Sequence, residues 1–284
     1  MTDKVFVVTG VTSGIGKALA FGLARLGAQL ILVVRDQERG NLVLEEIKLQ
    51  TGNPKVERVL SDLASLSSVR NAAAIIKSTH GRIDVLINNA AIYKTRHELS
   101  LDGFELMFAT NHLGPFLLTQ LLLDPLMTSG SARILNITAP STVELDFDDL
   151  QSERDFNSLR AFGATKMMNL LFTFELARRL ENTGVTVNAV HPGLARSSLM
   201  DETSALMRFL VWLGSAPVER RTGDIIRVAV DPEFEKVTDR FFHKAKEIEA
   251  AAYARNAEAQ KQLWEVSRNL VGAHEVEIPP QLTM

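Results

Sequence analysis

The sequence predicts an α/β fold in which helices cover both faces of one doubly wound parallel sheet. Short runs of β-branched and aliphatic residues alternate with longer Ala- and Leu-rich helical patterns along nearly the whole chain. The first run, 5–9, stops at Gly10, and a helical pattern starts after Gly14, which is the strand, turn and helix order of a parallel unit. The 284 residues suffice for one large domain or two small ones. Because no linker or repeat divides them, residues 1–284 are expected to form a single domain.

Bulk composition excludes several kinds of site and partner. The formal charge of −3 gives no electrostatic reason to expect a nucleic-acid partner, and the absence of cysteine excludes disulfides and thiolate sites. No apolar run reaches the ~18 residues of a membrane span. The first strand pattern begins at Val5, which leaves no room for a signal peptide. We therefore expect a cytoplasmic protein without a membrane span.

The other elements are expected in regular alternation along the chain. Apolar runs that end at polar, charged or glycine residues predict strands at 30–34, 56–60, 84–87, 133–137, 186–190 and 240–242, which with the first makes about seven. Helical patterns predict helices at 15–27, 37–50, 66–79, 103–123, 160–180, 218–230 and 257–270. Because a parallel sheet binds ligands beyond the carboxyl ends of its strands, the residues that follow the strands are the candidate site.

Each glycine of the first turn has a physical role in this arrangement. Gly10 ends the strand in a tight turn, Gly14 lets the backbone approach a phosphate, and Gly16 lets the helix sit close to the sheet. The start of the helix then offers unpaired N–H groups and the positive end of the helix dipole to an anion. The turn therefore favours a Rossmann-type dinucleotide site, although a plain strand-to-helix turn would also explain the glycines alone.

The spacing G-xxx-G-x-G differs from the G-x-G-x-x-G of long-chain dehydrogenases. Together with Asn88-Asn89-Ala90, Asn111, the helix that carries Lys166, and Pro192-Gly193, it resembles the short-chain dehydrogenase/reductase superfamily. The blocks match in order and spacing over about the first 200 residues, and the tail 263–267 resembles the retinol-dehydrogenase-like branch. The resemblance implies hydride transfer between a nicotinamide cofactor and a carbonyl or alcohol.

The end of the second expected strand favours NADP(H) as that cofactor. Val34 stands where members that prefer NAD carry aspartate, and Arg35 follows, as suits a 2′-phosphate, although a solvated arginine is the alternative. By the resemblance, Asp62 lies near the adenine amine; it could also help to cap the next helix, and the two roles are compatible. The full expected cofactor set is Gly10, Thr12, Ser13, Gly14, Ile15, Gly16, Arg35, Asp62, Leu63, Asn89, Ala90, Ala91, Lys166, Pro192, Gly193 and Ser197.

The family's catalytic tyrosine and serine are missing from their expected places. Members carry a tyrosine that exchanges the proton, and a lysine four residues later holds the ribose and lowers the pKa of the tyrosine. Here Phe162 precedes Lys166, so the lysine is kept and the hydroxyl is lost. Matching the end of the fifth strand without a gap puts Ala139 in the place of the serine, with Thr138 and Ser141 beside it. Because this loop differs in length among members, a register shifted by one or two residues is the alternative.

Three groups are conceivable substitutes for the lost proton donor. They are Tyr93, from the loop after the fourth strand, His191, near the nicotinamide, and a water held between Asn111 and Lys166. Tyr93 could equally point into solvent or the lid, and His191 could be a packed neighbour of the cofactor. The expected catalytic set is Asn111, Lys166, Ser141 and Tyr93.

Two apolar stretches predict partners. Family resemblance places a substrate lid at about 196–215, and the residues from Leu199 to Leu213 suggest an apolar substrate, although a core-packing helix would use such residues too. The helix at 160–180 is apolar on more than one face between Met167 and Ala177, which allows a homodimer. Three functions stay open: an NADP(H)-dependent oxidoreductase with an atypical proton donor, an NADP(H)-binding protein without turnover, and a non-redox catalyst that uses the same pocket.

Overall fold

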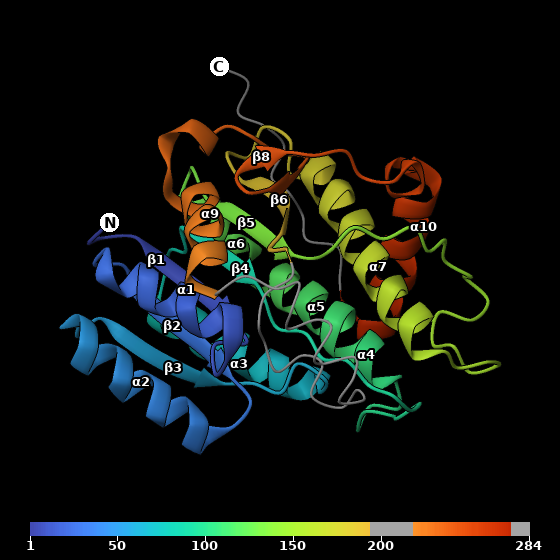
Figure 1. Ribbon diagram of the computed structural model, residues 1–284, viewed down its shortest axis with the longest axis horizontal. Helices are drawn as coiled ribbons and strands as arrows, with labels where there is room; N and C mark the ends of the chain where they lie inside the picture. Colours follow the sequence, from blue (N-terminus) through green and yellow to red (C-terminus); the bar gives the residue numbers. More distant parts are fainter. Residues whose placement is uncertain (194–217, 274–284) are drawn as a thin grey trace.

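Among residues 1–193 and 218–273, which the computed structural model describes, eight strands form one sheet in the order β3-β2-β1-β4-β5-β6-β7-β8 (Figure 1). The strands are β1 (Val5–Thr9), β2 (Gln29–Val34), β3 (Val56–Leu60), β4 (Val85–Asn88), β5 (Arg133–Ile137), β6 (Thr186–His191), β7 (Arg240–His243) and β8 (Lys246–Glu247). All pairs are parallel except β7 with β8. The chain runs outward from β1 to β3 and restarts on the other side of β1 with β4. This reversal is the switch point at which open α/β sheets bind ligands.

Helices cover both faces of this sheet, as the sequence predicts. The helices are α1 (Gly14–Arg25), α2 (Gln37–Thr51), α3 (Leu66–Thr79), α4 (Leu106–Phe108), the π-helical η1 (Ala109–Leu113), α5 (Gly114–Leu121), α6 (Leu123–Thr128), α7 (Ser158–Arg179), α9 (Val218–Val230), the 3₁₀ turns η3 (Pro232–Phe234) and η4 (Ala252–Arg255), and α10 (Ala257–Val271). Along β1, Phe6 and Val8 face the core beneath α1, α2 and α9, whereas Val7 faces the core beneath α3, α5 and α7. This alternation is what a strand buried on both faces requires.

The expected helix at 103–123 begins later than predicted and is not uniform. Gly103 has a φ of +81°, and Leu99 pairs with Glu105 in an isolated bridge, so the first residues form a turn. The buried carboxylate of Glu105 accepts the N–H groups of Met107 (3.0 Å) and Phe108 (2.7 Å), which starts the helix at 106. Burial raises the pKa of this carboxyl. The π-helical turn η1 then interrupts the helix at Asn111.

The second apolar face of α7 is covered within the same chain. On α10, Leu263 and Trp264 are buried in the core that contains α7, and the Trp264 ring stacks on Phe172 at 6.1 Å. The fully buried Glu175 of α7 pairs with Arg179 (2.6 Å), whose guanidinium lies 4.2 Å from the Trp264 ring. The apolar pattern of α7 is therefore explained without a second subunit, and the homodimer stays a prediction.

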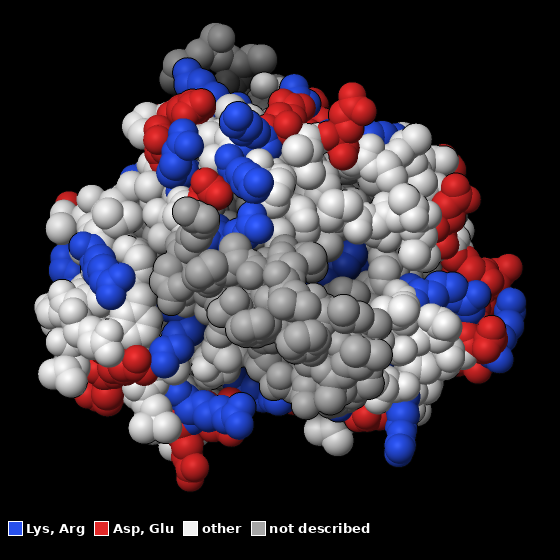
Figure 2. All heavy atoms as spheres, in the orientation of Figure 1, with Lys and Arg blue, Asp and Glu red and all other residues white. Residues whose placement is uncertain are grey.

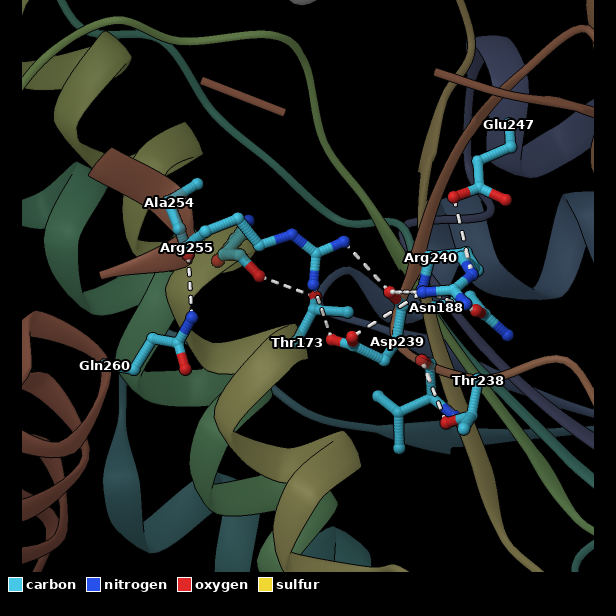
Figure 3. Close-up of polar contacts among 11 residues, drawn as sticks. Thr173, Asn188, Thr238, Asp239, Arg240, Glu247, Ala254, Arg255 and Gln260 are labelled. Carbon is cyan, nitrogen blue, oxygen red and sulfur yellow. Dashed lines mark hydrogen bonds and ion pairs between the residues drawn. The ribbon is translucent and has the colours of Figure 1, made fainter. Parts of the chain in front are cut away.

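Polar contacts fasten the C-terminal segment near the amino ends of β6 and β7 (Figure 3). Asp239, just before β7, binds Arg255 of η4 at 2.7 Å, and Arg240 lies 3.4 Å from Glu247. Asn188 accepts the backbone N–H of Arg240 at 3.0 Å. These contacts lie at the amino ends, so the carboxyl ends of the strands stay available for a site. The expected lid at 196–215 lies wholly within 194–217, outside the described residues. None of the described helices is long and apolar enough to cross a membrane.

Candidate functional site

The turns after β1 and β4 are locked together at the switch point. The Thr9 hydroxyl oxygen accepts the backbone N–H groups of Asn89 (2.9 Å) and Ala90 (3.0 Å). In return, the Asn89 side chain donates to the carbonyls of Thr9 (2.9 Å) and Gly10 (3.1 Å). Asn89 therefore joins the ends of the two strands. Thr9 is a site residue that the sequence analysis missed, and a hydroxyl directly before Gly10 was its only signal.

The glycine turn leaves no room for side chains at two positions. A Cβ on Gly10 would lie 2.7 Å from the Ala90 Cα, and a Cβ on Gly16 would lie 2.1 Å from the Gly10 carbonyl oxygen. Helix α1 therefore sits directly against the turn, and its first N–H groups open at the carboxyl edge of the sheet, around the expected residues Thr12, Ser13 and Ile15. No acidic residue lies in the first turn of α1. This cradle of backbone fits the diphosphate of a dinucleotide.

A second positive region lies at the start of α2. Arg35, directly after β2, and Arg39 are both exposed there, and the Asp36 carboxylate caps the helix by accepting the N–H of Arg39 at 2.9 Å. The two guanidinium groups and the helix N-terminus together fit a phosphate group. The sequence analysis named Arg35 and missed Arg39, which only the helical geometry brings to the same end.

Asp62 and Leu63 line the turn after β3. The Asp62 carboxylate accepts the N–H of Ala64 at 3.0 Å, whereas Ser65 is the capping residue of α3. The capping alternative for Asp62 therefore does not hold. A Cβ on Gly114 would lie 2.3 Å from the Leu63 carbonyl oxygen, so α5 presses this turn into place beside the crevice.

Lys166 is buried on α7 with a single close aromatic neighbour. The side chain is 6 % exposed, and its Nζ lies 4.7 Å from the centre of the Phe162 ring. Within 1–193 and 218–273, no hydrogen bond or ion pair of this ammonium is found. Burial alone lowers the pKa of Lys166 to about 8. A buried cation without a counter-ion is costly, so this lysine is poorly explained by stability.

Tyr93 lies against the Phe162 ring. The rings of Tyr93 and Phe162 meet edge to face at 5.5 Å, in a small cluster with Met107 and Ala161. The phenol donates to the Ser158 Oγ at 3.0 Å, at the start of α7. Tyr93 is therefore next to the expected reaction centre, but its proton is engaged one helical turn away. Its part in catalysis stays a prediction.

Asn111 fastens the loop after β4 to α7. Its Oδ1 accepts the N–H of Ile92 (2.8 Å), and its Nδ2 donates to the Ile92 carbonyl (2.9 Å) and to the Thr165 hydroxyl (3.2 Å). Both amide hydrogens are used, so a water between Asn111 and Lys166 would have to bind another atom of Asn111. Thr165, which the sequence analysis did not name, directly precedes Lys166, so its hydrogen bond links Asn111 to this part of α7.

The hydroxyls on both sides of Ala139 are engaged with the backbone of α7. Thr138 donates to the Lys166 carbonyl at 3.0 Å, and Ser141 donates to the Gly163 carbonyl at 2.8 Å. Ala139 lies half-buried between them. The loop after β5 is thus pinned to the segment that carries Phe162 and Lys166, and neither neighbouring hydroxyl has its hydrogen free in this arrangement.

The end of β6 brings a third strand to the same edge. The His191 and His243 rings lie 4.8 Å apart, and burial, followed by the charge of His243, lowers the pKa of His191 to about 4. His191 is therefore a weak base here rather than a ready acid. Pro192 and Gly193 follow it, half-buried, whereas Ser197 lies outside the described residues. No group of three or more His, Asp or Glu residues in the described part of the chain could hold a metal.

Known proteins match this chain over almost its whole length. A family model described as short chain dehydrogenase matches residues 4–207. Human retinol dehydrogenase 13 is 40% identical over 280 residues, which cover 95% of this chain and 85% of that protein.

Solved structures agree with that match. An uncharacterised protein from Mycobacterium Paratuberculosis superposes with a TM-score of 0.76 at 29% identity, covering 96% of this chain and 95% of the other. A structure described as an NAD(P) dependent gluconate 5-dehydrogenase from Beutenbergia cavernae, with bound NADP, superposes with a TM-score of 0.69 at 27% identity. The match covers 86% of this chain and 96% of the other. This chain belongs to the short chain dehydrogenase family of oxidoreductases.

Proposed function

We propose that the chain is an NADP(H)-dependent oxidoreductase that transfers hydride to or from an apolar carbonyl or alcohol. The observation that carries the proposal is Lys166, a buried ammonium without a described counter-ion at the carboxyl edge of the sheet. Cofactor hydroxyls would supply the acceptors that this ammonium lacks. The relatives named retinol dehydrogenases support an apolar substrate, as does the apolar segment 199–213.

The described residues fit a dinucleotide along the whole crevice. The turn 10–16 and the start of α1 would bind the diphosphate, Arg35 and Arg39 the 2′-phosphate, and Lys166 the ribose beside the nicotinamide. When bound, the nicotinamide supplies or accepts the hydride. The bound NADP of the Beutenbergia structure supports the same class of cofactor.

Proton transfer to or from the substrate oxygen is the slow step of the proposed reaction. Phe162 cannot donate one, Ala139 cannot steady the substrate oxygen, and the hydroxyls of Tyr93 and Ser141 are engaged elsewhere. Lys166, whose pKa is lowered to about 8, has its ammonium 4.7 Å from the centre of the Phe162 ring and can pass a proton through water. We therefore expect turnover with reactive aldehydes before turnover with plain ketones.

The same engaged hydroxyls favour a second candidate function, NADP(H) binding without turnover. The two are separated by following NADPH absorbance with a panel of apolar aldehydes and ketones, and by identifying the alcohol formed. Steady NADPH loss matched by alcohol supports the oxidoreductase. NADPH binding without any alcohol from the whole panel would leave only the binding function.

Arg35→Ala is expected to weaken NADPH binding by about 10- to 100-fold and NADH binding by less than about twofold. The reason is that only NADPH carries the phosphate that the guanidinium would bind. Calorimetric titration with both cofactors measures the change. Arg25→Ala, which removes an exposed arginine at the far end of α1, is the control. Equal losses for NADPH and NADH would show that Arg35 does not bind the 2′-phosphate.

A further inference from the structure

Arg221, in the first turns of α9, has a buried donor without an acceptor. The side chain is half-buried, and its Nε finds no hydrogen-bond partner in the described part of the chain. Guanidinium groups have only donors, so an unpaired one that is buried indicates a missing acceptor. Neither the family resemblance nor the sequence pattern assigns this residue a role.

The Arg221 guanidinium packs against the backbone of Gly193, at the carboxyl edge of the sheet. A Cβ on Gly193 would lie 3.0 Å from the Arg221 Cζ, 3.1 Å from its Nη1 and 3.1 Å from the His243 Cε1. Gly193 follows β6, and His243 ends β7, so the Arg221 guanidinium lies at the carboxyl ends of these two strands. A side chain at 193 would displace the guanidinium, which makes the glycine a condition of this placement.

The packing of α9 on α1 brings the starts of the two helices, with Arg221 on one and the glycine turn before the other, to the same side of the sheet. Ile226 fills the space that a Cβ on Gly22 would take, at 2.3 Å, and the two helices lie side by side (Figure 1). Both begin at the carboxyl edge of a parallel sheet, so they run in the same direction. Arg221 and Lys17 each precede this contact by five residues, about 7.5 Å along the axis of their own helix, so both lie toward the starts of the two helices.

The first turn of α1 lacks a basic side chain directed at its own end. Lys17 is its one basic residue, and its ammonium binds Glu46 of α2 at 2.6 Å. A cation from α9 would complement the helix N-terminus there. On the face shown in Figure 2, Lys and Arg side chains lie over the region of α9 and β8, with Asp and Glu side chains among them.

We propose that Arg221 binds the diphosphate of the dinucleotide, opposite the backbone N–H groups of the glycine turn. The proposal rests on the proposed function, because it requires a dinucleotide in the crevice. A planar guanidinium is suited to two phosphate oxygens at once, and the diphosphate lies in the middle of the ligand, between its riboses. Arg221 is thus a binding residue that holds the cofactor from the β6 and α9 side.

Calorimetric titration of Arg221→Gln tests this assignment with NADPH and with 2′-phospho-ADP-ribose, which keeps the diphosphate and lacks the nicotinamide. We expect both ligands to bind about 10- to 100-fold more weakly than to the parent chain. Arg227→Gln is the matched control, because Arg227 is exposed on the same helix and pairs with Glu233 at 3.3 Å. The control should change either affinity by less than about twofold.

The outcomes separate this proposal from the proposed function. A parent chain that binds neither ligand overturns both. A parent chain that binds both, with Arg221→Gln equal to Arg227→Gln, overturns the Arg221 assignment alone, as does a loss confined to NADPH. Should Arg221→Gln fail to melt cooperatively, Arg221→Lys decides: a loss of about threefold to tenfold for both ligands supports the assignment, and an unchanged affinity contradicts it.

Discussion

The double variant Phe162→Tyr, Ala139→Ser is expected to reduce apolar ketones with NADPH about 10²- to 10⁴-fold faster than the parent chain. This range is the usual contribution of general acid catalysis. The Phe162 ring lies 4.7 Å from the Lys166 ammonium, so a phenol built on this ring would be close to a positive charge that favours its phenolate. Ala139 is half-buried between Thr138 and Ser141, which both donate hydrogen bonds to carbonyls of α7. The backbone at 139 is therefore held in place, and a serine there would have a defined position.

The measurement is kcat for one ketone, followed by NADPH absorbance, in the parent, both single variants and the double variant. Phe104→Tyr, which adds a phenol elsewhere, is the control. A reduction rate that falls as the pH rises through the pKa of a tyrosine beside an ammonium would identify the new acid. An unchanged rate in the double variant would show that the site is not built for hydride transfer. A tenfold loss in Tyr93→Phe of the parent would instead identify Tyr93 as the working donor.

Lys166→Met is expected to stabilise the cofactor-free protein at pH 7 by up to roughly 3 kcal/mol while it weakens NADPH binding at least about tenfold. Burial lowers the pKa of Lys166 from its ordinary 10.5 to about 8, so the folded state bears the cost of a charged, desolvated ammonium at neutral pH. The stabilisation follows from that difference in pKa, since methionine carries no such charge. A residue that costs stability and serves binding is the pattern of a functional site.

The pH dependence has a definite sign. Below about pH 8 Lys166 is charged in both the folded and the unfolded state, so folding bears the full free-energy cost of burying the charged ammonium. Between about 8 and 10.5 the unfolded chain binds the extra proton, so the stability of the parent rises relative to Lys166→Met. Urea unfolding measures the difference in the free energy of unfolding between Lys166→Met and the parent. This difference should be smaller at pH 10.5 than at pH 7, and the exposed Lys236→Met is the control. A gap of the same size at both values would contradict the assigned cause.

Most of the fold was predictable because its signals are local. The strands at 56–60 and 133–137 and the helix at 218–230 lie where the sequence predicts them, since buried runs and amphipathic periods identify such segments directly. The helix expected from 103 begins at 106, because a bridge between Leu99 and Glu105 competes with helical propensity in its first residues. The covering of α7 by α10 depends on contacts between segments about a hundred residues apart, which no local pattern reveals.

The site was predictable where a motif fixes a residue and not where packing does. Lys166 and Asn89 follow from spacing, and the structure places both at the carboxyl edge of the sheet. Thr9 and Arg221 carry no motif. Thr9 acts through the backbone of the turn after β4, and Arg221 reaches the edge only because α9 packs on α1. The hydrogen bond from Ser141 to the Gly163 carbonyl likewise depends on how the loop packs on α7, which no sequence motif indicates.

A calorimetric titration of the parent chain with NADPH tests the central claim most directly. If the crevice holds a dinucleotide, binding saturates at one site per chain with a dissociation constant of about 1 μM to 1 mM, the range of ordinary KM values, and NADH binds more weakly. No binding of either cofactor at millimolar concentration, by a protein that melts cooperatively, would contradict the account.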